Sequence, residues 1–376
     1  MFGDLSILAL QEYWWFIIAL LGGLFVFMTF VQGGQTLLYT LGKTEIERDL
    51  IVNSLGRKWE LTFTTLVLFG GALFAAFPLF YSVSFGGAYF VWMAILFTFI
   101  IQAVSYEYRK KANNILGEKT FEVFLYINGS LGILLIGAAV ATFFTGSHFV
   151  VNDMNLSHWT TPFYGLEAVL NPFNDIFALM LFFLVRVQAS LYFINNINEE
   201  LIVMRAKKVL AFSTVLFVAA FLYVVVSILM MNGFAVDPVT QTVSVQAHKY
   251  LHNFLDMPIV LGMFLIGTLM VLWAIFATLF RNSKKGIWCS GVGTVLVVTS
   301  LFLLVGYGGT SYYPSLSDLQ SSLTIQNSAS SHFTLTAMSY VSLMVPFVLA
   351  YIFWAWRAMD MDKITIKEVE SDPHRY

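Results

Sequence analysis

The sequence predicts an all-α integral membrane protein with nine transmembrane helices, its N-terminus outside and its C-terminus in the cytoplasm. Two observations carry this prediction. Hydrophobic residues make up 58% and charged residues only 11% of the 376 residues, a composition typical of proteins whose solvent is mostly lipid. In addition, nine long apolar runs divide the chain into ten segments, and the positive charges occupy every second segment.

The distribution of positive charge gives the orientation. Of the 20 Lys and Arg residues, 18 fall in these alternate segments, and the intervening segments contain only Lys249. Because Lys and Arg are held on the cytoplasmic side of a membrane, the alternation indicates both the helix count and the cytoplasmic face. The 18 residues are Lys43, Arg48, Arg57, Lys58, Arg109, Lys110, Lys111, Lys119, Arg205, Lys207, Lys208, Arg281, Lys284, Lys285, Arg357, Lys363, Lys367 and Arg375.

The spans follow from the length that a bilayer requires, about 20 apolar residues. We expect a single membrane domain, 1–376, with a first four-helix bundle in 1–145, a second in 171–308 and a peripheral ninth helix at 334–357. The expected spans are residues 13–41, 62–84, 87–107, 122–145, 172–195, 210–232, 258–280, 287–307 and 334–357.

Small residues and loop composition predict how these helices pack. Gly71 and Ala75 in the second span, and Gly129, Gly132 and Gly137 in the fourth, occur at spacings that let helix backbones approach closely in lipid. We interpret them as packing positions. The external loop 308–333 is almost free of charge, and we expect it to pack against a partner or the membrane surface. Pro78 and Pro346 are expected toward helix interiors.

The chain shows no cofactor site in its sequence. Haem needs axial His, Met or Cys ligands inside a helix bundle, and none of the six histidines falls in the middle of a span. The single cysteine, Cys289, excludes an internal disulfide and a Cys-based metal cluster. His248 and His252 have the spacing of two ligands on one helical face, but they lie in an external loop, where we favour a structural role. Nothing resembles a nucleic-acid-binding patch, and the N-terminus lacks the features of a removable signal peptide.

Ionisable residues in or beside the membrane are the remaining candidates, because each is costly unless it is paired or hydrated. Arg186 lies in the middle of the fifth span. It is either the partner of a carboxylate, which could belong to another subunit, or a member of an internal ion pair or a snorkelling side chain. Glu60 follows Lys58 at the cytoplasmic mouth of the second span, and Glu107 ends the third. For Glu107, as for Asp175 and Asp256 at helix ends, structural roles are favoured.

Five ordered motifs carry a family resemblance: IVNSLGRKWE with GGALFAAFP at 51–60 and 70–78, EYRKK at 107–111, LNPF at 170–173, DMPI at 256–259 and SLTIQNSASS at 322–331. With nine spans and an external N-terminus, the chain resembles subunit II of the cytochrome bd-type quinol oxidases over essentially its whole length. The resemblance implies a bacterial inner-membrane complex that oxidises quinol and reduces dioxygen to water. In that family, subunit I carries the b-type and d-type haems and subunit II is a cofactor-free partner of similar fold.

The resemblance therefore implies that this subunit holds no catalytic residue and stabilises the haem-bearing subunit I, with membrane lipid and small accessory subunits as further partners. A proton or dioxygen path is an additional role that it allows. Glu60 matches the position of an acid in related subunits, so Lys58, Glu60 and Glu107 are candidates for a proton path. Arg186 has no recognised counterpart and stays a candidate for an intramembrane charge at a subunit interface.

The chain also departs from the family pattern. Residues 29–37 read TFVQGGQTL where many members carry acidic residues late in the first helix, and Asn327 stands where Asp is common. This chain therefore lacks the carboxylates that could conduct protons or support the structure at these positions. The alternative function is a secondary transporter or channel with nine spans, whose site would be built from broken helices, but Pro78, Pro258 and Pro346 form no inverted pairing. A scaffold that binds no substrate is the third possibility.

Overall fold

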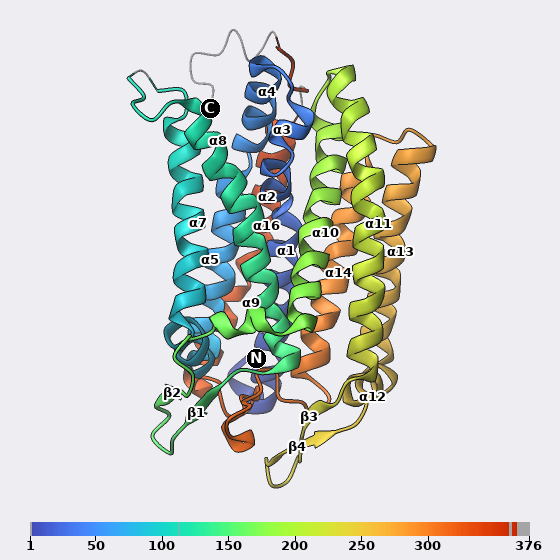
Figure 1. Cartoon of the computed structure of the whole chain (residues 1–376). Helices are drawn as coiled ribbons and strands as arrows, with labels where there is room; N and C mark the ends of the chain where they lie inside the picture. Colours follow the sequence, from blue (N-terminus) through green and yellow to red (C-terminus); the bar gives the residue numbers. More distant parts are fainter. Residues whose placement is uncertain (1, 112, 361–362, 367–376) are drawn as a thin grey trace.

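The structure, a computed structural model, describes residues 2–111, 113–360 and 363–366. Within these residues, nine helical segments are long and apolar enough to cross a membrane, which confirms the predicted number. They run side by side in one bundle (Figure 1). The segments are Ile7–Gln35, Glu45–Ala76, Tyr89–Tyr108, Glu118–Thr145, Pro172–Asn196, Glu200–Met230, Pro258–Phe280, Gly286–Gly306 and His332–Met359.

Several of these segments consist of more than one helix. The first four contain α1 (Ile7–Met28), α2 (Phe30–Gln35), α4 (Glu45–Gly56), α5 (Trp59–Ala76), α7 (Tyr89–Tyr108), α8 (Glu118–Ile127) and α9 (Ile133–Thr145). The last five contain α10 (Pro172–Asn196), α11 (Glu200–Met230), α13 (Pro258–Phe280), α14 (Gly286–Gly306), α15 (His332–Ser342) and α16 (Val345–Met359).

Shorter elements connect the spans. The short helices are α3 (Leu38–Leu41), α6 (Pro78–Phe80), α12 (Lys249–Asp256), the 3-10 turns η1 (Phe2–Asp4), η4 (Leu166–Leu170) and η5 (Leu319–Ser321), and the π-helical turns η2 (Tyr81–Gly87) and η3 (Asn128–Gly132). Two antiparallel hairpins pair β1 (Phe149–Val151) with β2 (Ser157–Trp159) and β3 (Gly233–Val236) with β4 (Val243–Gln246).

The basic segments meet at one end of the bundle, drawn at the top of Figure 1, and we name it the basic end. It contains α3, α4 and the links from α7 to α8, α10 to α11 and α13 to α14. The two hairpins and the N-terminal residues lie at the opposite end. Which end faces the cytoplasm stays a prediction, as does the division into two four-helix bundles. Lys367 and Arg375, two of the basic residues named above, lie outside the described residues.

The first span begins earlier than predicted. The predicted start, residue 13, comes just after Gln11 and Glu12 interrupt the apolar run, whereas α1 begins at Ile7 with Ser6 as its N-cap. The Ser6 hydroxyl accepts a hydrogen bond from the Ala9 amide at 3.2 Å. Gln11 is tolerated inside the helix because its side-chain amide donates to the Gln326 carbonyl at 3.3 Å. A distant loop thus satisfies the polar group that obscured the start of the helix.

The second span and the two prolines also differ from expectation. The span was predicted at 62–84, but helix begins at Glu45, where Thr44 and Glu47 form a capping box, and α5 ends at Ala76. Pro78 is the first residue of α6, and Pro346 lies in the first turn of α16. Both predictions of an interior position were wrong, because proline is tolerated in a first turn, where its missing N–H would have no intrahelical acceptor.

The glycines of the fourth span are packing positions, as predicted. A Cβ atom on Gly137 would lie 2.6 Å from the Ala178 Cα of α10, and one on Gly129 would lie 2.4 Å from the Gln32 carbonyl oxygen of α2. Gly71 differs from these. Gly71 is exposed, and a Cβ atom there would meet no atom of the chain within 4 Å.

The external loop 308–333 packs onto its own bundle, which corrects the expectation of a partner or the membrane surface. Tyr312 and Tyr313 are fully buried. The Tyr312 ring lies 4.3 Å from that of Trp15, and Tyr313 stacks on Phe149 at 5.4 Å, between ring centroids. Its nearly uncharged composition with two buried tyrosines therefore reflects an intramolecular cap over the end of the helices.

Replacing Gly137 with Leu is expected to destabilise the bundle by about 1–3 kcal/mol, because the new side chain must separate α9 from the backbone of α10. Thermal unfolding of the purified complex measures the effect. Gly262→Leu in α13 is the matched control, since a Cβ atom there meets nothing within 4 Å. Equal melting temperatures for the two variants would contradict the close approach of α9 and α10.

Candidate functional site

Lys58 forms a buried ion pair with a residue that sequence analysis did not single out. Its side chain is fully buried just before α5, and Nζ lies 2.9 Å from Oδ1 of Asp360, which follows α16. The ammonium also lies 5.3 Å from the ring centroid of Trp356. The two partners are 302 positions apart in the chain, so no local pattern could have paired them.

Asp360 is held by neutral donors as well. Asn196 Nδ2 donates to Oδ1 at 3.1 Å, and Trp356 Nε1 donates to Oδ2 at 2.7 Å. Asn196 in turn accepts a hydrogen bond from the Ser54 hydroxyl at 2.6 Å. These contacts join the ends of α4, α10 and α16 around one carboxylate. Such additional hydrogen bonds are what a buried ion pair requires to compensate for desolvation.

Glu60 and Glu107, the other predicted proton-path residues, are exposed. Glu60 lies in the first turn of α5 and Glu107 near the end of α7. Trp59 stacks on Tyr106 with 5.5 Å between ring centroids, so the two helix ends that carry these carboxylates are neighbours. In the described residues, no hydrogen bond or ion pair joins Lys58 to either of them. The structure therefore separates a buried lysine from two exposed carboxylates.

A second ionic cluster joins α4, α7 and α8 at the basic end. Arg109 Nη2 lies 2.6 Å from Asp49 Oδ1 and 2.8 Å from Glu122 Oε1, and all three side chains are buried. Tyr39 donates to Glu122 Oε2 at 2.9 Å, and Arg48 Nε lies 3.3 Å from the same oxygen. The presence of an acid at the start of the predicted fourth span was the signal that could have identified Glu122.

The surroundings of this cluster shift the pKa values of Arg109 and Tyr39. Burial disfavours the charged form of Arg109, but the hydrogen bond to Glu122 and the charge of Asp49 outweigh it, and the pKa of Arg109 is raised. Burial of Tyr39 and its hydrogen bond to Glu122 raise the pKa of the phenol to about 12. The guanidinium stays charged and the phenol neutral near pH 7, which keeps the cluster intact.

Arg186 makes its contacts within the chain. Its Nη1 donates to the Thr36 hydroxyl at 3.1 Å, and the guanidinium carbon lies 5.4 Å from the ring centroid of Phe182. The side chain is partly buried, and among the described residues it forms no ion pair. Its predicted role at a subunit interface stays a prediction.

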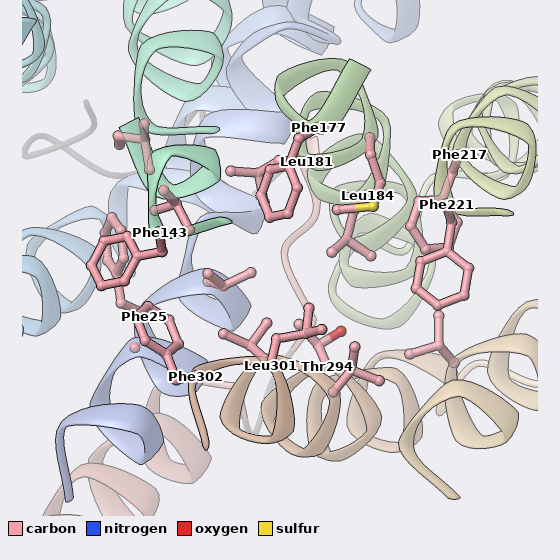
Figure 2. Close-up of a pocket in the computed structure, with 18 of the residues that line it drawn as sticks. Phe25, Phe143, Phe177, Leu181, Leu184, Phe217, Phe221, Thr294, Leu301 and Phe302 are labelled. Atoms are coloured by element: carbon pink, nitrogen blue, oxygen red, sulfur yellow. The ribbon is translucent and has the colours of Figure 1, made fainter. Parts of the chain in front are cut away.

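An apolar cavity of about 190 Å³ lies among α1, α5, α7, α9, α10, α11, α13 and α14. Nearly all of its lining side chains are apolar, and aromatic rings occur among a larger number of aliphatic side chains. Figure 2 shows Phe25, Phe143 and Phe302 at one end of the cavity and Phe217 and Phe221 at the other. Apolar cavities of this size stay dry and take up apolar molecules.

Histidines lie at the ends of the bundle in the part of the chain that the structure describes. His148 and His158 are in or beside the first hairpin, His248 and His252 lie at α12, and His332 begins α15. Among the described residues, no group of three or more His, Cys, Asp or Glu side chains is placed to hold a metal ion.

The buried pair yields a prediction. Asp360→Asn removes the charge that compensates Lys58 and is expected to lower the free energy of unfolding by about 3–5 kcal/mol. Thermal unfolding of the purified complex measures this loss, and Lys58→Met combined with Asp360→Leu should recover much of it. Glu45→Gln, which breaks the exposed pair with Lys110, should cost less than about 1 kcal/mol. An Asp360→Asn variant as stable as Glu45→Gln would show that the pair does not stabilise the fold.

Comparison with known proteins gives the family. Residues 10–359 match the family model described as "Cytochrome bd terminal oxidase subunit II". The chain is 28% identical to the "Probable cytochrome oxidase subunit 2" of Haemophilus influenzae, covering 93% of this chain and 94% of that one. It is 27% identical to the "Cytochrome bd-I ubiquinol oxidase subunit 2" of Escherichia coli K12, covering 97% and 98%.

A solved structure has the same fold. The chain aligns with one from the bd oxidase of Geobacillus thermodenitrificans with a TM-score of 0.56 at 12% identity, over 95% of this chain and 97% of that one. At this identity the likeness shows the fold alone. The family model, by contrast, spans nearly all of the nine helical segments. The chain therefore belongs to the subunit II family of the cytochrome bd terminal oxidases.

Proposed function

We propose that this chain is the subunit without haem in a quinol:dioxygen oxidoreductase complex and that it stabilises a haem-bearing subunit I. The family assignment supplies the complex, and its relatives are named as subunits of ubiquinol oxidases. The position of the histidines supports the assignment of the haems to subunit I. In the described residues they lie at the ends of the bundle, away from the interior where axial haem ligands are needed.

The outer face of α5 is the surface that we assign to subunit I. Glu60, Thr64 and Gly71 are exposed there, at spacings that place them on one side of the helix. Small residues allow close helix contact where lipid offers no hydrophobic drive. Large apolar residues such as Val67 are exposed on α5 as well, as Leu222 is on α11 and Leu269 on α13, so the assignment of the α5 face depends on Glu60 and the small residues.

Gly71→Leu tests this surface. Because a side chain at Gly71 meets no atom of this chain, the subunit should still fold, but the added bulk should block the approach of a partner helix. We expect a severalfold loss of haem-bearing subunit I that co-purifies with a tagged copy of this chain. Gly262→Leu, equally open but on α13, should leave co-purification unchanged. Equal recovery of subunit I with both variants would contradict the assignment of the α5 face.

Protons consumed in dioxygen reduction must reach a buried site, and lipid-facing helices offer no route except ionisable side chains and water. The exposed carboxylate of Glu60 at the basic end can exchange protons with the adjoining solution, and Glu107 ends the neighbouring α7. Lys58 supports the entry through its ion pair with Asp360, which holds the start of α5 in place. We therefore infer a proton entry at the α5 and α7 ends, on the side proposed for subunit I.

Glu60→Gln in the purified complex, reconstituted into vesicles, is expected to slow quinol oxidation several-fold while the haem spectrum is unchanged. The amide keeps the size and polarity of the side chain but cannot release a proton. Asp175→Asn, at an exposed position in the first turn of α10, is the control and should not alter turnover. Undiminished turnover and membrane potential with Glu60→Gln would leave only a role at the helix N-terminus.

A dioxygen path would use the apolar cavity. Dioxygen is a small apolar molecule, and it partitions from lipid into aromatic-lined space more readily than water does. Leu66 and Trp92 extend the cavity lining to α5 and α7, the same side that we assign to subunit I. Dioxygen that enters between these helices would then move within apolar surroundings toward the partner.

A further inference from the structure

Buried polar atoms without hydrogen-bond partners concentrate in one region of the bundle. Among the described residues, twelve buried side-chain nitrogen or oxygen atoms lack such a partner. Six of them belong to side chains on α2, α5, α7, η3 and α10. They are Gln32 Oε1, Gln35 Oε1, Trp59 Nε1, Gln102 Nε2, Asn128 Oδ1 and Arg186 Nε.

These side chains, with their partners Thr98, Tyr106 and Thr36, lie at successive levels of the bundle, and we name the set the polar column. Gln32 Nε2 donates to Gln102 Oε1 at 3.1 Å, and Gln35 Nε2 donates to Tyr106 Oη at 3.2 Å. One turn further from the basic end, Asn128 Nδ2 donates to Thr98 Oγ1 at 3.3 Å. The α7 members, at positions 98, 102 and 106, follow one face of the helix at four-residue spacing.

Close helix contact brings the other members to this face. Gly129 lies so near α2 that a Cβ atom would be 2.4 Å from the Gln32 carbonyl oxygen and 3.1 Å from Gln35 Cβ. Asn128 beside it belongs to the π-helical turn η3, a distortion that often marks functional positions. Arg186 joins the column through Thr36, one turn after Gln32.

The column runs from the ionic cluster at the basic end into the middle of the bundle. Thr98 and Arg109 are separated along α7 by about 16 Å, at a rise of 1.5 Å per residue. Gln32, Gln102, Tyr106 and Asn128 are all buried, so neither lipid nor bulk solvent reaches them. Buried polar groups without partners are costly, and internal water is the usual means of satisfying them.

The chemistry of the six atoms identifies the ligand. Three are acceptors, on Gln32, Gln35 and Asn128, and three are donors, on Trp59, Gln102 and Arg186. Exchanging the amide orientations of Gln32 and Gln102 leaves one donor and one acceptor, so the balance persists. A metal cation would use acceptors only and be repelled by Arg186, whereas an anion would use donors only. Water both donates and accepts.

We propose that the polar column binds a file of water molecules extending from the Arg109–Glu122 cluster to Asn128. This water hydrates the Arg186 guanidinium, for which the described residues supply no carboxylate within ion-pair distance. The charge of Arg186 is thereby accommodated in the membrane without a partner subunit. The inference is independent of haem turnover and of the proposed proton entry at Glu60.

Radiolytic labelling of the purified complex in ¹⁸O-water tests the proposal, because hydroxyl radicals formed from bound water oxidise the side chains beside it. Tyr106 is 1% exposed and Tyr250 is 0% exposed, so bulk solvent reaches neither ring. We expect ¹⁸O incorporation at Tyr106 to be several-fold faster than at Tyr250. Equal rates at the two tyrosines would overturn the proposal.

A variant that lacks two amides of the polar column provides the second test. Gln32→Leu with Gln102→Leu removes one donor–acceptor pair together with its two unpartnered atoms and should reduce labelling of Tyr106 without changing that of Tyr250. Gln188→Leu, at a buried glutamine that contacts Thr294 elsewhere in the bundle, is the matched control. If the double variant does not assemble, Gln35→Met replaces it. Unchanged Tyr106 labelling in an assembled variant would show that no water file is present.

Discussion

The structure depends on a constraint that lipid imposes, namely that each polar or charged group between the helix ends must be satisfied by the protein or by water enclosed in it. This chain meets it by placing its buried charges in pairs near the basic end. Arg109, Asp49 and Glu122 join α4, α7 and α8, and Lys58 with Asp360 joins α5 to the end of α16. Because removing one partner would leave a charge buried, these pairs fix which helix ends meet, whatever their net contribution to stability.

The sequence was sufficient for the fold class because hydropathy and positive charge are averaged over whole segments. It was less informative wherever one distant contact decides the outcome. Gln11 obscured the start of α1 because its acceptor, the Gln326 carbonyl, belongs to the far end of the chain. The 308–333 loop was assigned to a partner or membrane surface because no local pattern shows that Tyr312 packs on Trp15. Pro78 was misplaced because a helix ending at Ala76 and a new one starting at the proline have the same apolar composition as one long helix.

The candidate site shows the same limit at the level of single residues. Lys58 and Glu60 are two positions apart, yet one side chain is fully buried and the other exposed, because successive residues of a helix point in different directions. Sequence analysis could group them by position and charge, but it could not supply Asp360 or Asn196, which complete the surroundings of Lys58. Similarly, Gln32 and Gln35 were noted in the sequence only because they lie in a segment where related subunits carry carboxylates. The sequence does not show that their amides contact α7, a contact that accompanies the close packing of Gly129 against α2.

The interior of the subunit therefore contains two kinds of space. The apolar cavity, whose lining includes Phe25, Phe143 and Phe302, excludes water and suits apolar molecules, whereas the polar column contains amides and a guanidinium. Amides hydrogen-bond to water but do not titrate near neutral pH, so the column can be hydrated without storing protons as a carboxylate would. Glu60 and Glu107, which can exchange protons, lie outside it on the exposed ends of α5 and α7. The proton entry proposed at Glu60 and Glu107 and the water proposed in the column therefore occupy different parts of the subunit, the first at its exposed surface and the second in its interior.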